Sequence, residues 1–473
     1  MSKTAPSSLI DAALDHGLTA VEVERQWSRL HGEPHKSRPH SACALGSGIR
    51  KWEGGELANW AQRGGQLRPD RVLRFIPASG AATRMFKALL AGDADAIRLF
   101  HEHWGQFPFK DLAESQGPCA TAEEKVTTVL ERLALQDQPK GNLPFHRESQ
   151  KVETAFEAQM VEWAAMFHEG HAPLHFTLPK AGFEGHLAQL QEMAKYHGLL
   201  CTASVQHPAT DTFALNEQGE PFSTEDGVPL FRPGGHGALL HNLQDLATAH
   251  PGALITIKNI DNVRPHDALP EVLPWRRALL GMADAVLEAR DAALQALDAG
   301  GLEPAVDWLK IWPGRIAEQM PQDAAALRDA LDRPLMVAGM VRNEGEPGGG
   351  PFWLEDDEGV LRAQIVESSE MNAQDSVVRA VMASATHFNP VDLVCALTGP
   401  DKVPYDLSQF VDRNRDFLVT KSHGGRPLHG LEHPGLWNGG MGRWNTVFVE
   451  VDSATFAPVK TVFDLLRPAH RTA

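Results

Sequence analysis

Residues 77–84, Pro-Ala-Ser-Gly-Ala-Ala-Thr-Arg, place small side chains and an arginine between an apolar run and a helical pattern. Small residues at a strand-to-helix turn let backbone N–H groups approach a phosphate, and the helix N-terminus adds a favourable dipole. Arg84 adds a guanidinium that can hold two phosphate oxygens at once. Gly80 is the single glycine of this loop, which therefore matches neither G-x-x-x-x-G-K-[ST] nor G-x-G-x-x-G. Taken alone, the loop is equally an ordinary strand–turn–helix connection.

Two lysines stand in segments framed by proline. Lys140 follows Pro139, and Lys460 comes two residues after Pro458. Proline restricts the local backbone, so each lysine can act as a positioned point charge for a phosphate. The alternative for Lys140 is an exposed loop lysine.

Asp261 follows an apolar strand predicted over 253–258. Open α/β sheets bind ligands at the carboxyl ends of their strands. A lone carboxylate there can anchor Mg²⁺, which leaves its other sites to waters and phosphates. The structural alternative is a turn aspartate that bonds its own backbone.

Further polar residues end predicted strands or lie in glycine-rich turns. Gln206 offers a paired donor and acceptor that can match the edge of a base. Gly235 and Gly237 flank His236 and permit a ligand ring close to the backbone, or simply a tight helix entry. Residues 343–350 and 364–370 present the carboxylates and amides that sugar hydroxyls require.

From residue 72 the pattern alternates strand and helix, which predicts an α/β fold with a mixed, mostly parallel sheet flanked by helices. Helices are expected over 8–32, 152–167 and 271–298, and 33–70 reads as a connection. Strands are expected over 72–76, 173–178, 199–205, 253–258, 335–341, 361–367 and 446–451.

Composition narrows the function. The 473 residues carry a formal charge of −17, which argues against a nucleic-acid binder but leaves room for a local pocket for a small anion. The first residues lack an apolar signal region, and no apolar run approaches the length of a membrane span. The four cysteines show no C-x-x-C spacing. A cytoplasmic protein with reduced thiols is therefore expected.

Read in order, eight segments resemble the nucleotidyltransferases that make nucleotide-sugars, above all the UDP-sugar pyrophosphorylases of the UDP-glucose and UDP-N-acetylhexosamine branches. The sequences of residues 77–84 and 231–237 also resemble those of the DUF4301 proteins, a bacterial family whose members would match nearly the whole chain. The eight segments are 79–84, 139–141, 206–208, 234–237, 261–262, 343–348, 366–370 and 456–460.

The resemblance implies a GT-A-like, Rossmann-type nucleotidyltransferase fold with four regions. These are an N-terminal helical extension (1–70), a nucleotide-binding half (71–270), linker helices (271–330) and a sugar-phosphate-binding half (331–473). It implies transfer of a nucleoside monophosphate from a nucleoside triphosphate to a sugar 1-phosphate, with Mg²⁺ and release of pyrophosphate. The implied partners are therefore a nucleotide and a phosphorylated acceptor, with neither nucleic acid nor membrane.

The resemblance also assigns roles to residues of this chain. Arg84, Lys140 and Lys460 would hold the reacting phosphates, and Asp261 the metal. The nucleotide would contact Ser79, Gly80, Ala81, Thr83, Gln206, Gly235, His236 and Gly237. The sugar and its phosphate would contact Asn343, Glu346, Gly348, Glu367, His387 and Asn389.

Two departures from the family pattern bear on this reading. Gly80-Ala81-Ala82 replaces a double glycine, and a long segment, 88–138, separates Arg84 from Lys140. That segment is either a lid or an insertion that displaces the lysine. A kinase-like or amino-acid-activating transferase, and a non-catalytic nucleotide or phosphosugar binder, remain alternatives. The prediction requires that Arg84, Lys140, Lys460 and Asp261 converge.

Overall fold

The chain divides into two units, each assembled from three separate segments. The computed structural model describes residues 4–148, 151–168, 170–345 and 348–471. Unit 1 consists of Met1–Lys51, Gln206–Leu254 and Ala283–Glu450, and unit 2 of Trp52–Val205, Ile255–Met282 and Val451–Ala473. Helix α11 (Leu269–Asp298) begins in unit 2 and ends in unit 1. The four regions predicted from the sequence were defined by their roles in binding. The division into two compact units does not test those roles.

The sheet of unit 2 carries the strands that precede the candidate phosphate-binding loops. Its order is β11-β4-β7-β8, and the β4–β7 and β7–β8 pairs are parallel. The strands of the unit are β4 (Val72–Pro77), β5 (Pro144–Glu148), β6 (Lys151–Thr154), β7 (Leu174–Leu178), β8 (Cys201–Val205) and β11 (Leu254–Lys258). The helices wholly within it are α3 (Glu56–Gly65), α4 (Lys87–Leu90), α5 (Ala94–Glu102), α6 (Lys110–Gln116), α7 (Ala122–Thr127), α8 (Ala155–Ala164) and α9 (Phe183–Tyr196).

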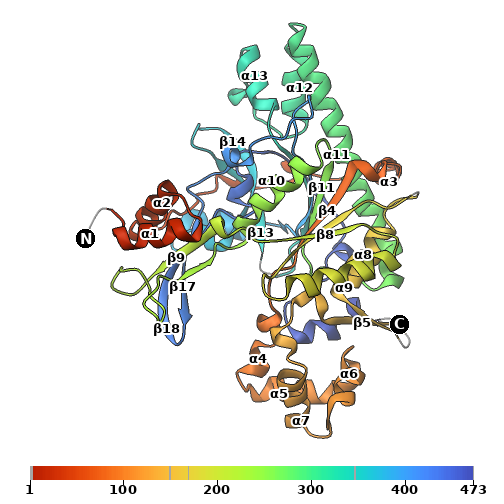
Figure 1. Ribbon diagram of the computed structural model, residues 1–473. Helices are drawn as coiled ribbons and strands as arrows, with labels where there is room; N and C mark the ends of the chain where they lie inside the picture. The colour runs from red at the N-terminus through yellow and green to blue at the C-terminus, as the bar shows by residue number, and fades with distance from the viewer. Residues whose placement is uncertain (1–3, 149–150, 169, 346–347, 472–473) are drawn as a thin grey trace. The chain divides into compact units, whose positions relative to one another are not determined.

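The long segment between Arg84 and Lys140 forms a helical cluster of its own. Helices α4 to α7 gather there, at the bottom of Figure 1. Its interior is aromatic: the ring of Phe100 lies 4.8 Å from that of Phe107 and 5.5 Å from that of Trp104. A capping box between Thr121 and Glu124 begins α7. The insertion therefore has a hydrophobic core of its own.

In unit 1 the paired strands of a mixed arrangement run in the order β2-β3-β19-β12-β16, with β15 also paired to β12. The β12–β19 pair is parallel and the β12–β16 pair antiparallel. Two smaller sheets have the orders β1-β13-β14 and β10-β9-β18-β17. The strands are β1 (Ser41–Ala42), β2 (Ala44–Leu45), β3 (Gly48–Arg50), β9 (Asp211–Leu215), β10 (Phe231–Pro233), β12 (Leu335–Arg342), β13 (Gly349–Glu355), β14 (Leu361–Glu367), β15 (His387–Phe388), β16 (Asp392–Ala396), β17 (Phe417–His423), β18 (Arg426–Glu432) and β19 (Asn445–Glu450). The helices wholly within the unit are α1 (Ser7–His16), α2 (Ala20–His31), α10 (Leu239–Ala249), α12 (Glu303–Ile311), α13 (Ala324–Leu331) and α14 (Ser376–Ala383).

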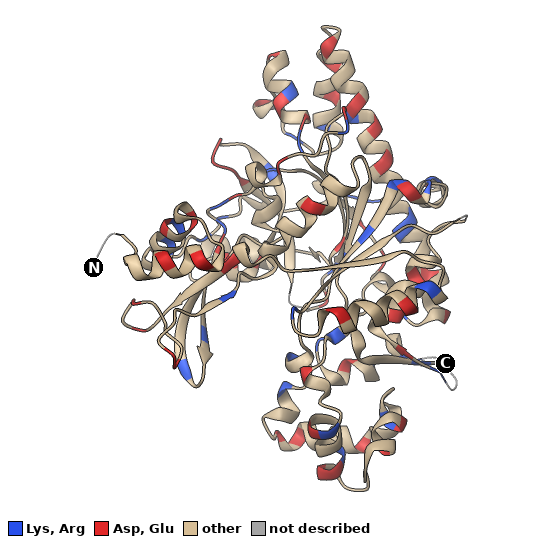
Figure 2. Cartoon of the chain, in the orientation of Figure 1, with Lys and Arg blue, Asp and Glu red and all other residues tan. Residues whose placement is uncertain are grey.

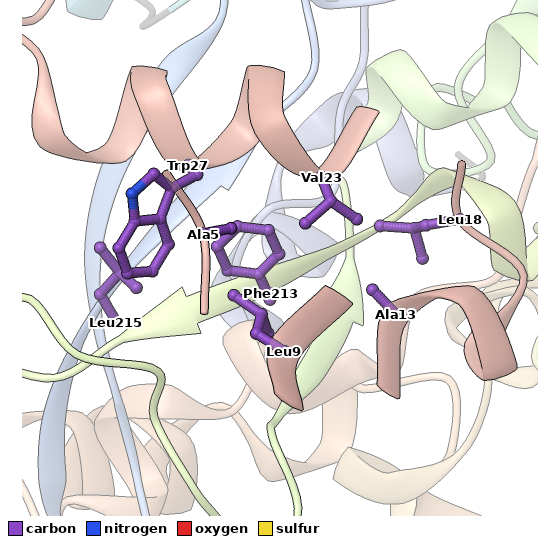
Figure 3. Packing of buried hydrophobic residues seen from close by; sticks show 8 residues of the cluster. All are labelled: Ala5, Leu9, Ala13, Leu18, Val23, Trp27, Phe213 and Leu215. Carbon is purple, nitrogen blue, oxygen red and sulfur yellow. The ribbon is translucent and has the colours of Figure 1, made fainter. Parts of the chain in front are cut away.

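The N-terminal helices are tied to unit 1 by an apolar cluster. Gly17, at φ 106°, ends α1, and the Thr19 side chain caps α2. Trp27 packs beside Phe213 of β9, with ring centroids 6.4 Å apart. Figure 3 shows this cluster, whose members are Ala5, Leu9, Ala13, Leu18, Val23, Trp27, Phe213 and Leu215. The extension thus shares a hydrophobic core with β9.

The seven strands expected from apolar runs are all present, with ends shifted by at most two residues. Three other expectations need correction. Residues 8–32 form two helices, because Gly17 ends the first. The expected connection 33–70 contains β1 to β3 and α3. The helix expected from residue 152 begins at Ala155, because Thr154 caps it and Lys151–Thr154 pairs with β5.

The charged residues, the cysteines and the apolarity of the helices can be compared with what the composition predicted. Figure 2 shows acidic positions spread over the helices, with basic positions between them. All four cysteines are free thiols, and Cys43, Cys201 and Cys395 are buried. No helix in the described ranges combines the length and the apolarity that crossing a bilayer requires.

Candidate functional site

Backbone hydrogen bonds bring four loops of unit 2 together. The Lys140 amide donates to the Gly80 carbonyl at 3.2 Å, and the Ala82 amide donates to Gln138 at 3.1 Å. The Val459 amide donates to the carbonyl of Asp261 at 3.1 Å. Another bond runs from the Val462 amide to Met85, just after Arg84, at 3.0 Å. Residues 79–85, 138–140, 261–262 and 458–462 therefore form one continuous structure.

Asp261 lies between the two lysines predicted to bind phosphate. Its Oδ2 accepts hydrogen bonds from Nζ of Lys140 at 2.7 Å and from Nζ of Lys460 at 3.0 Å. The Asp261 and Lys140 side chains are 8% and 15% exposed, whereas that of Lys460 is 55% exposed. The inserted helical cluster has therefore not displaced Lys140 from this carboxylate.

Opposing effects set the charges of this cluster. Burial alone would raise the pKa of the Asp261 carboxyl, but the charges of Lys140 and Lys460 outweigh burial and hold that pKa below its ordinary value. Burial lowers the pKa of the Lys140 ammonium, which Asp261 only partly offsets and the charge of Lys460 lowers further. The Asp261 carboxylate is thus ionised at neutral pH. Because Lys140 is buried, its ammonium loses a proton more easily than that of an exposed lysine.

The second oxygen of Asp261 fits a divalent cation. Oδ1 is buried and has no hydrogen-bond partner among the described residues. Mg²⁺ is commonly held by one or two carboxylates, with waters and phosphates completing its shell. No group of three or more His, Cys, Asp or Glu side chains in the described ranges could form an all-protein cage. A single-carboxylate Mg²⁺ site at Asp261 therefore suits the donors present.

The loop predicted to cradle phosphates lies beside this cluster. Arg84 is exposed and has no ion-pair partner among the residues that the structure describes. Ser79 is half-buried, Ala81 forms a bridge with Pro139, and the Thr83 hydroxyl donates to the Gln136 carbonyl at 3.1 Å. A Cβ added to Gly80 would meet nothing within 4 Å. The fold itself does not require glycine there.

The lowered pKa of Lys140 predicts how anion binding responds to alkaline pH. As the pH rises, binding of inorganic pyrophosphate should weaken earlier than it would with an ordinary lysine, whose pKa is about 10.4. Across the same range the folded chain binds fewer protons than the unfolded one, so the free energy of unfolding should rise with pH. Calorimetric titrations at several pH values test this, and the Lys140→Arg variant should move the loss of binding to higher pH. An unchanged profile in that variant would exclude Lys140 as the titrating group.

In unit 1, the predicted nucleotide residue His236 meets the predicted sugar residue Glu367. Nε2 of His236 lies 3.7 Å from Oε1 of Glu367. Nδ1 of His236 accepts a hydrogen bond from the Leu436 amide at 3.1 Å, and its ring stacks on Trp437 at 4.4 Å. Burial lowers the pKa of His236, which Glu367 and Glu432 only partly offset. The imidazole is therefore neutral at pH 7.

Gly237 is constrained by the chain's own backbone. A Cβ there would lie 2.7 Å from the carbonyl oxygen of His433 and closer still to that of Pro434. Gly237 also borders a pocket of about 410 Å³ in unit 1. Side chains of α2 and α10 line it, as do Asp406, Leu407, Ser408, Val411 and Arg413. The pocket is large enough for a small molecule.

We expect different results when Gly237 and Gly80 are each replaced by alanine. Gly237→Ala should destabilise unit 1, by about 1–3 kcal/mol, because backbone carbonyls leave no room for a methyl group. Gly80→Ala should leave the melting temperature unchanged, because a methyl group there meets nothing within 4 Å, and should weaken only the binding of a nucleoside triphosphate to the predicted phosphate loop. Thermal melts with and without nucleotide distinguish the two. Equal melting temperatures for both variants would contradict the packing argument.

The other predicted contacts in unit 1 lie near one another, because the Asn343 amide donates to Thr386, next to His387, and the Asn389 amide donates to Gly349, next to Gly348. Asn343 is exposed and accepts from the Gly345 amide, and Gly348 is exposed beside Phe388. His387 is held by Thr386 and Glu450, and Asn389 bonds Gly339 and Val391. The side chains of His387 and Asn389 support the local fold, and the ligand roles of all four residues stay predictions.

Gln206 and Glu346 are the remaining predicted contacts of the base and the sugar. Nε2 of Gln206 is buried and has no partner in the described part of the chain, and its role toward a base stays a prediction. Glu346 lies outside the described residues.

The sequence reading missed Asp464, which shapes the Lys460 loop. Its Oδ2 accepts from the amides of Lys460 and Thr461 and from the Thr461 hydroxyl, while Oδ1 pairs with Arg467 at 2.9 Å. Thr461 and Asp464 form a capping box. Its T-x-x-D pattern was visible in the sequence, because a hydroxyl residue and a carboxylate at this spacing cap a helical turn.

Comparisons with known proteins relate the whole chain to one family and to one fold. The profile of a family described as "Domain of unknown function (DUF4301)" matches residues 8–471. No protein of curated function matches the chain.

Solved structures show the fold. The uridine diphosphate N-acetylglucosamine pyrophosphorylase from Trypanosoma brucei, solved with an inhibitor, is 13% identical, and the match covers 97% of this chain and 74% of that one at a TM-score of 0.50. The UDP-glucose pyrophosphorylase from Leishmania major is 13% identical over 100% and 80%, at a TM-score of 0.49. The first likeness confirms the predicted α/β pyrophosphorylase-like fold with a mostly parallel sheet.

Proposed function

Since the chain belongs to the DUF4301 family and has a pyrophosphorylase-like fold, we propose that it is a Mg²⁺-dependent nucleotidyltransferase. It would transfer a nucleoside monophosphate from a nucleoside triphosphate to a sugar 1-phosphate and release pyrophosphate. The proposal rests above all on the contacts of the Asp261 carboxylate in unit 2. Its Oδ2 binds two lysines, and its Oδ1 is buried without a partner among the described residues.

The cluster suits a polyphosphate better than a purely structural role. Asp261 has two cationic partners, and Arg84, whose neighbour Met85 accepts a hydrogen bond from the Val462 amide of the Lys460 loop, has no counter-ion among the described residues. The surplus positive charge favours an anion. Oxygens of the triphosphate would take over the hydrogen bonds that Lys140 and Lys460 now give to Oδ2.

The residues present account for the steps of the transfer. An acceptor phosphate is already ionised, so its oxygen can attack the α-phosphorus without a general base. Arg84 would hold the β- and γ-phosphates, Lys140 the α- and β-phosphates, and Lys460 the acceptor phosphate. Oδ1 of Asp261 would hold Mg²⁺, which supplies charge neutralisation at the phosphate oxygens. Positioning and electrostatics would then carry the catalysis.

The test is detection of pyrophosphate. The purified chain is incubated with each nucleoside triphosphate, Mg²⁺ and a panel of sugar 1-phosphates, after a thermal-shift screen selects the nucleotides that bind. Release of pyrophosphate that requires both substrates supports the proposal. Release of a nucleoside diphosphate would indicate a kinase instead, and stabilisation by nucleotide with no product at all would indicate a binding protein.

A further inference from the structure

A connection in unit 1, residues 312–316, places Arg315 beside a small cavity. The Arg315 amide donates a hydrogen bond to the Leu309 carbonyl at 3.0 Å, which folds the connection back onto the end of α12. The cavity has a volume of about 20 Å³. Its walls are Leu309, Pro313, Arg315, residues 360–363 and residues 444–446, all within unit 1. Arg315 therefore lies beside the starts of β14 and β19.

The Arg315 side chain has no counter-ion in contact. It is half-buried, and its guanidinium forms neither a hydrogen bond nor an ion pair with any described residue. Its Nε is enclosed by protein and has no partner among the same residues. Burying a cation costs free energy unless an opposite charge or hydrogen-bond acceptors compensate it. Because the residue as a whole is still partly exposed, an ion from solution can reach it.

Two further arginines add to this cost. Burial, and then the charges of Arg362 and Arg333, lower the pKa of the Arg315 guanidinium to about 10. Arg362 lines the same cavity, and its side chain is 9% exposed. Arg333 is 7% exposed and pairs with Asp329, a carboxylate that is 75% exposed and therefore screened by water. The three guanidinium groups thus repel one another in a place partly withdrawn from solvent.

The carboxylates nearest these arginines are engaged elsewhere. Oδ2 of Asp356 accepts a hydrogen bond from Nε of Arg362 at 2.5 Å. Oε2 of Glu358 lies 3.7 Å from Nη2 of Arg362 and 3.9 Å from Nη2 of Arg333. Both carboxylates attract Arg315, but neither lies within ion-pair distance of it, and the Glu358 side chain is 50% exposed. The charge of Arg315 is therefore left for an anion.

The size of the cavity limits which anion it can hold. A cavity needs about 10–15 Å³ to hold one water molecule, so the space here suits a single monatomic ion better than a tetrahedral oxyanion. We propose that Arg315 and Arg362 bind a chloride ion in this cavity. The ion compensates the surplus charge of Arg315 and fastens the 312–316 connection to the first residues of β14 and β19. This inference is independent of the proposed function, which uses Asp261 and its lysines in unit 2.

Chloride should stabilise the wild type but not a variant without the Arg315 charge. Melting temperatures are measured in sodium gluconate, whose anion is too large for the cavity, with chloride replacing gluconate at constant sodium concentration. Replacing about 300 mM gluconate by chloride should raise the melting temperature of the wild type by about 2–4 °C, because the ion binds the folded state alone. Arg315→Met keeps a long side chain, removes the charge and should show no such rise. A wild type indifferent to chloride would overturn the inference.

The order of the two melting temperatures separates ion binding from an ordinary structural role. Without chloride, Arg315→Met should melt no lower than the wild type, because it no longer buries an unpaired cation. With chloride, the wild type should melt higher. A variant that melts lower than the wild type by the same interval in both salts would contradict the chloride site. Arg379→Gln is the matched control, since Arg379 is exposed on α14 in the same unit, and its response to chloride should equal that of the wild type.

Bromide locates the ion directly. Crystals of the wild type soaked in sodium bromide should show an anomalous peak beside the guanidinium of Arg315, and crystals of Arg315→Met should not. This measurement decides the question even if the variant fails to fold, because the wild type alone shows whether the cavity takes a halide. Bromide bound only at arginines elsewhere would overturn the assignment of the site to Arg315 and Arg362.

Discussion

Replacing Asp261 by Asn should reduce kcat about 10³-fold, a loss of the size seen when one essential electrostatic contact to a transition state is removed. Asparagine keeps the volume and can still accept the hydrogen bonds of Lys140 and Lys460 through one oxygen. It lacks the negative charge that a Mg²⁺ ion needs. The measurement is pyrophosphate release under saturating substrate, across a series of Mg²⁺ concentrations.

The same substitution should affect metal-free binding in the opposite direction. Asp261 neutralises Lys140 and Lys460 in the free protein, so removing its charge leaves both lysines available to an anion. Affinity for pyrophosphate without Mg²⁺ should therefore be retained or increased. Asp95→Asn is the matched control, since Asp95 lies on α5 of the same unit and its side chain is 83% exposed. Wild-type turnover in Asp261→Asn would remove this carboxylate from the site.

Replacing Lys140 by Met should lower kcat/KM for the nucleotide about 10²- to 10³-fold. The reason is its burial: with 15% of its side chain exposed, its charge is screened by solvent far less than that of Lys460, at 55%. The corresponding Lys460→Met variant should therefore lose less. Steady-state kinetics with the nucleotide varied give the comparison.

The control for both lysine variants is Lys195→Met, which removes an exposed charge from α9 in the same unit. It should leave the kinetics and the melting temperature unchanged. A larger effect at Lys460 than at Lys140 would contradict the ranking by burial. Equal, small effects at both positions would show that neither ammonium contacts the reacting phosphates.

The sequence predicted the central strands well, because each is a continuous apolar run whose residues are almost all buried. It missed the sheet formed by β9, β10, β17 and β18. Strand β17 has no buried residue, so it carries no apolar signal. Its pairing with β18 does follow from the turn: Gly424 and Gly425 have φ of 56° and 75°, and two adjacent glycines are a hairpin signal.

The site was predicted as residue types and chain order, and the contacts came from the structure. A proline within two residues before each of Lys140 and Lys460, and a strand before Asp261, indicated three positioned groups. That both lysines share one oxygen of Asp261 depends on backbone bonds between loops far apart in sequence, which no local pattern contains.

The threading of the chain through the two units has a consequence for biosynthesis. All segments of unit 1 have been translated once the ribosome passes Glu450, whereas unit 2 still lacks 451–473, the stretch that carries Lys460 and Asp464. Until those residues emerge, Asp261 is without one of its two ammonium partners. A nascent polypeptide stalled after residue 450 therefore lacks Lys460 and Asp464, and the contacts around Asp261 are complete only after these residues have been translated.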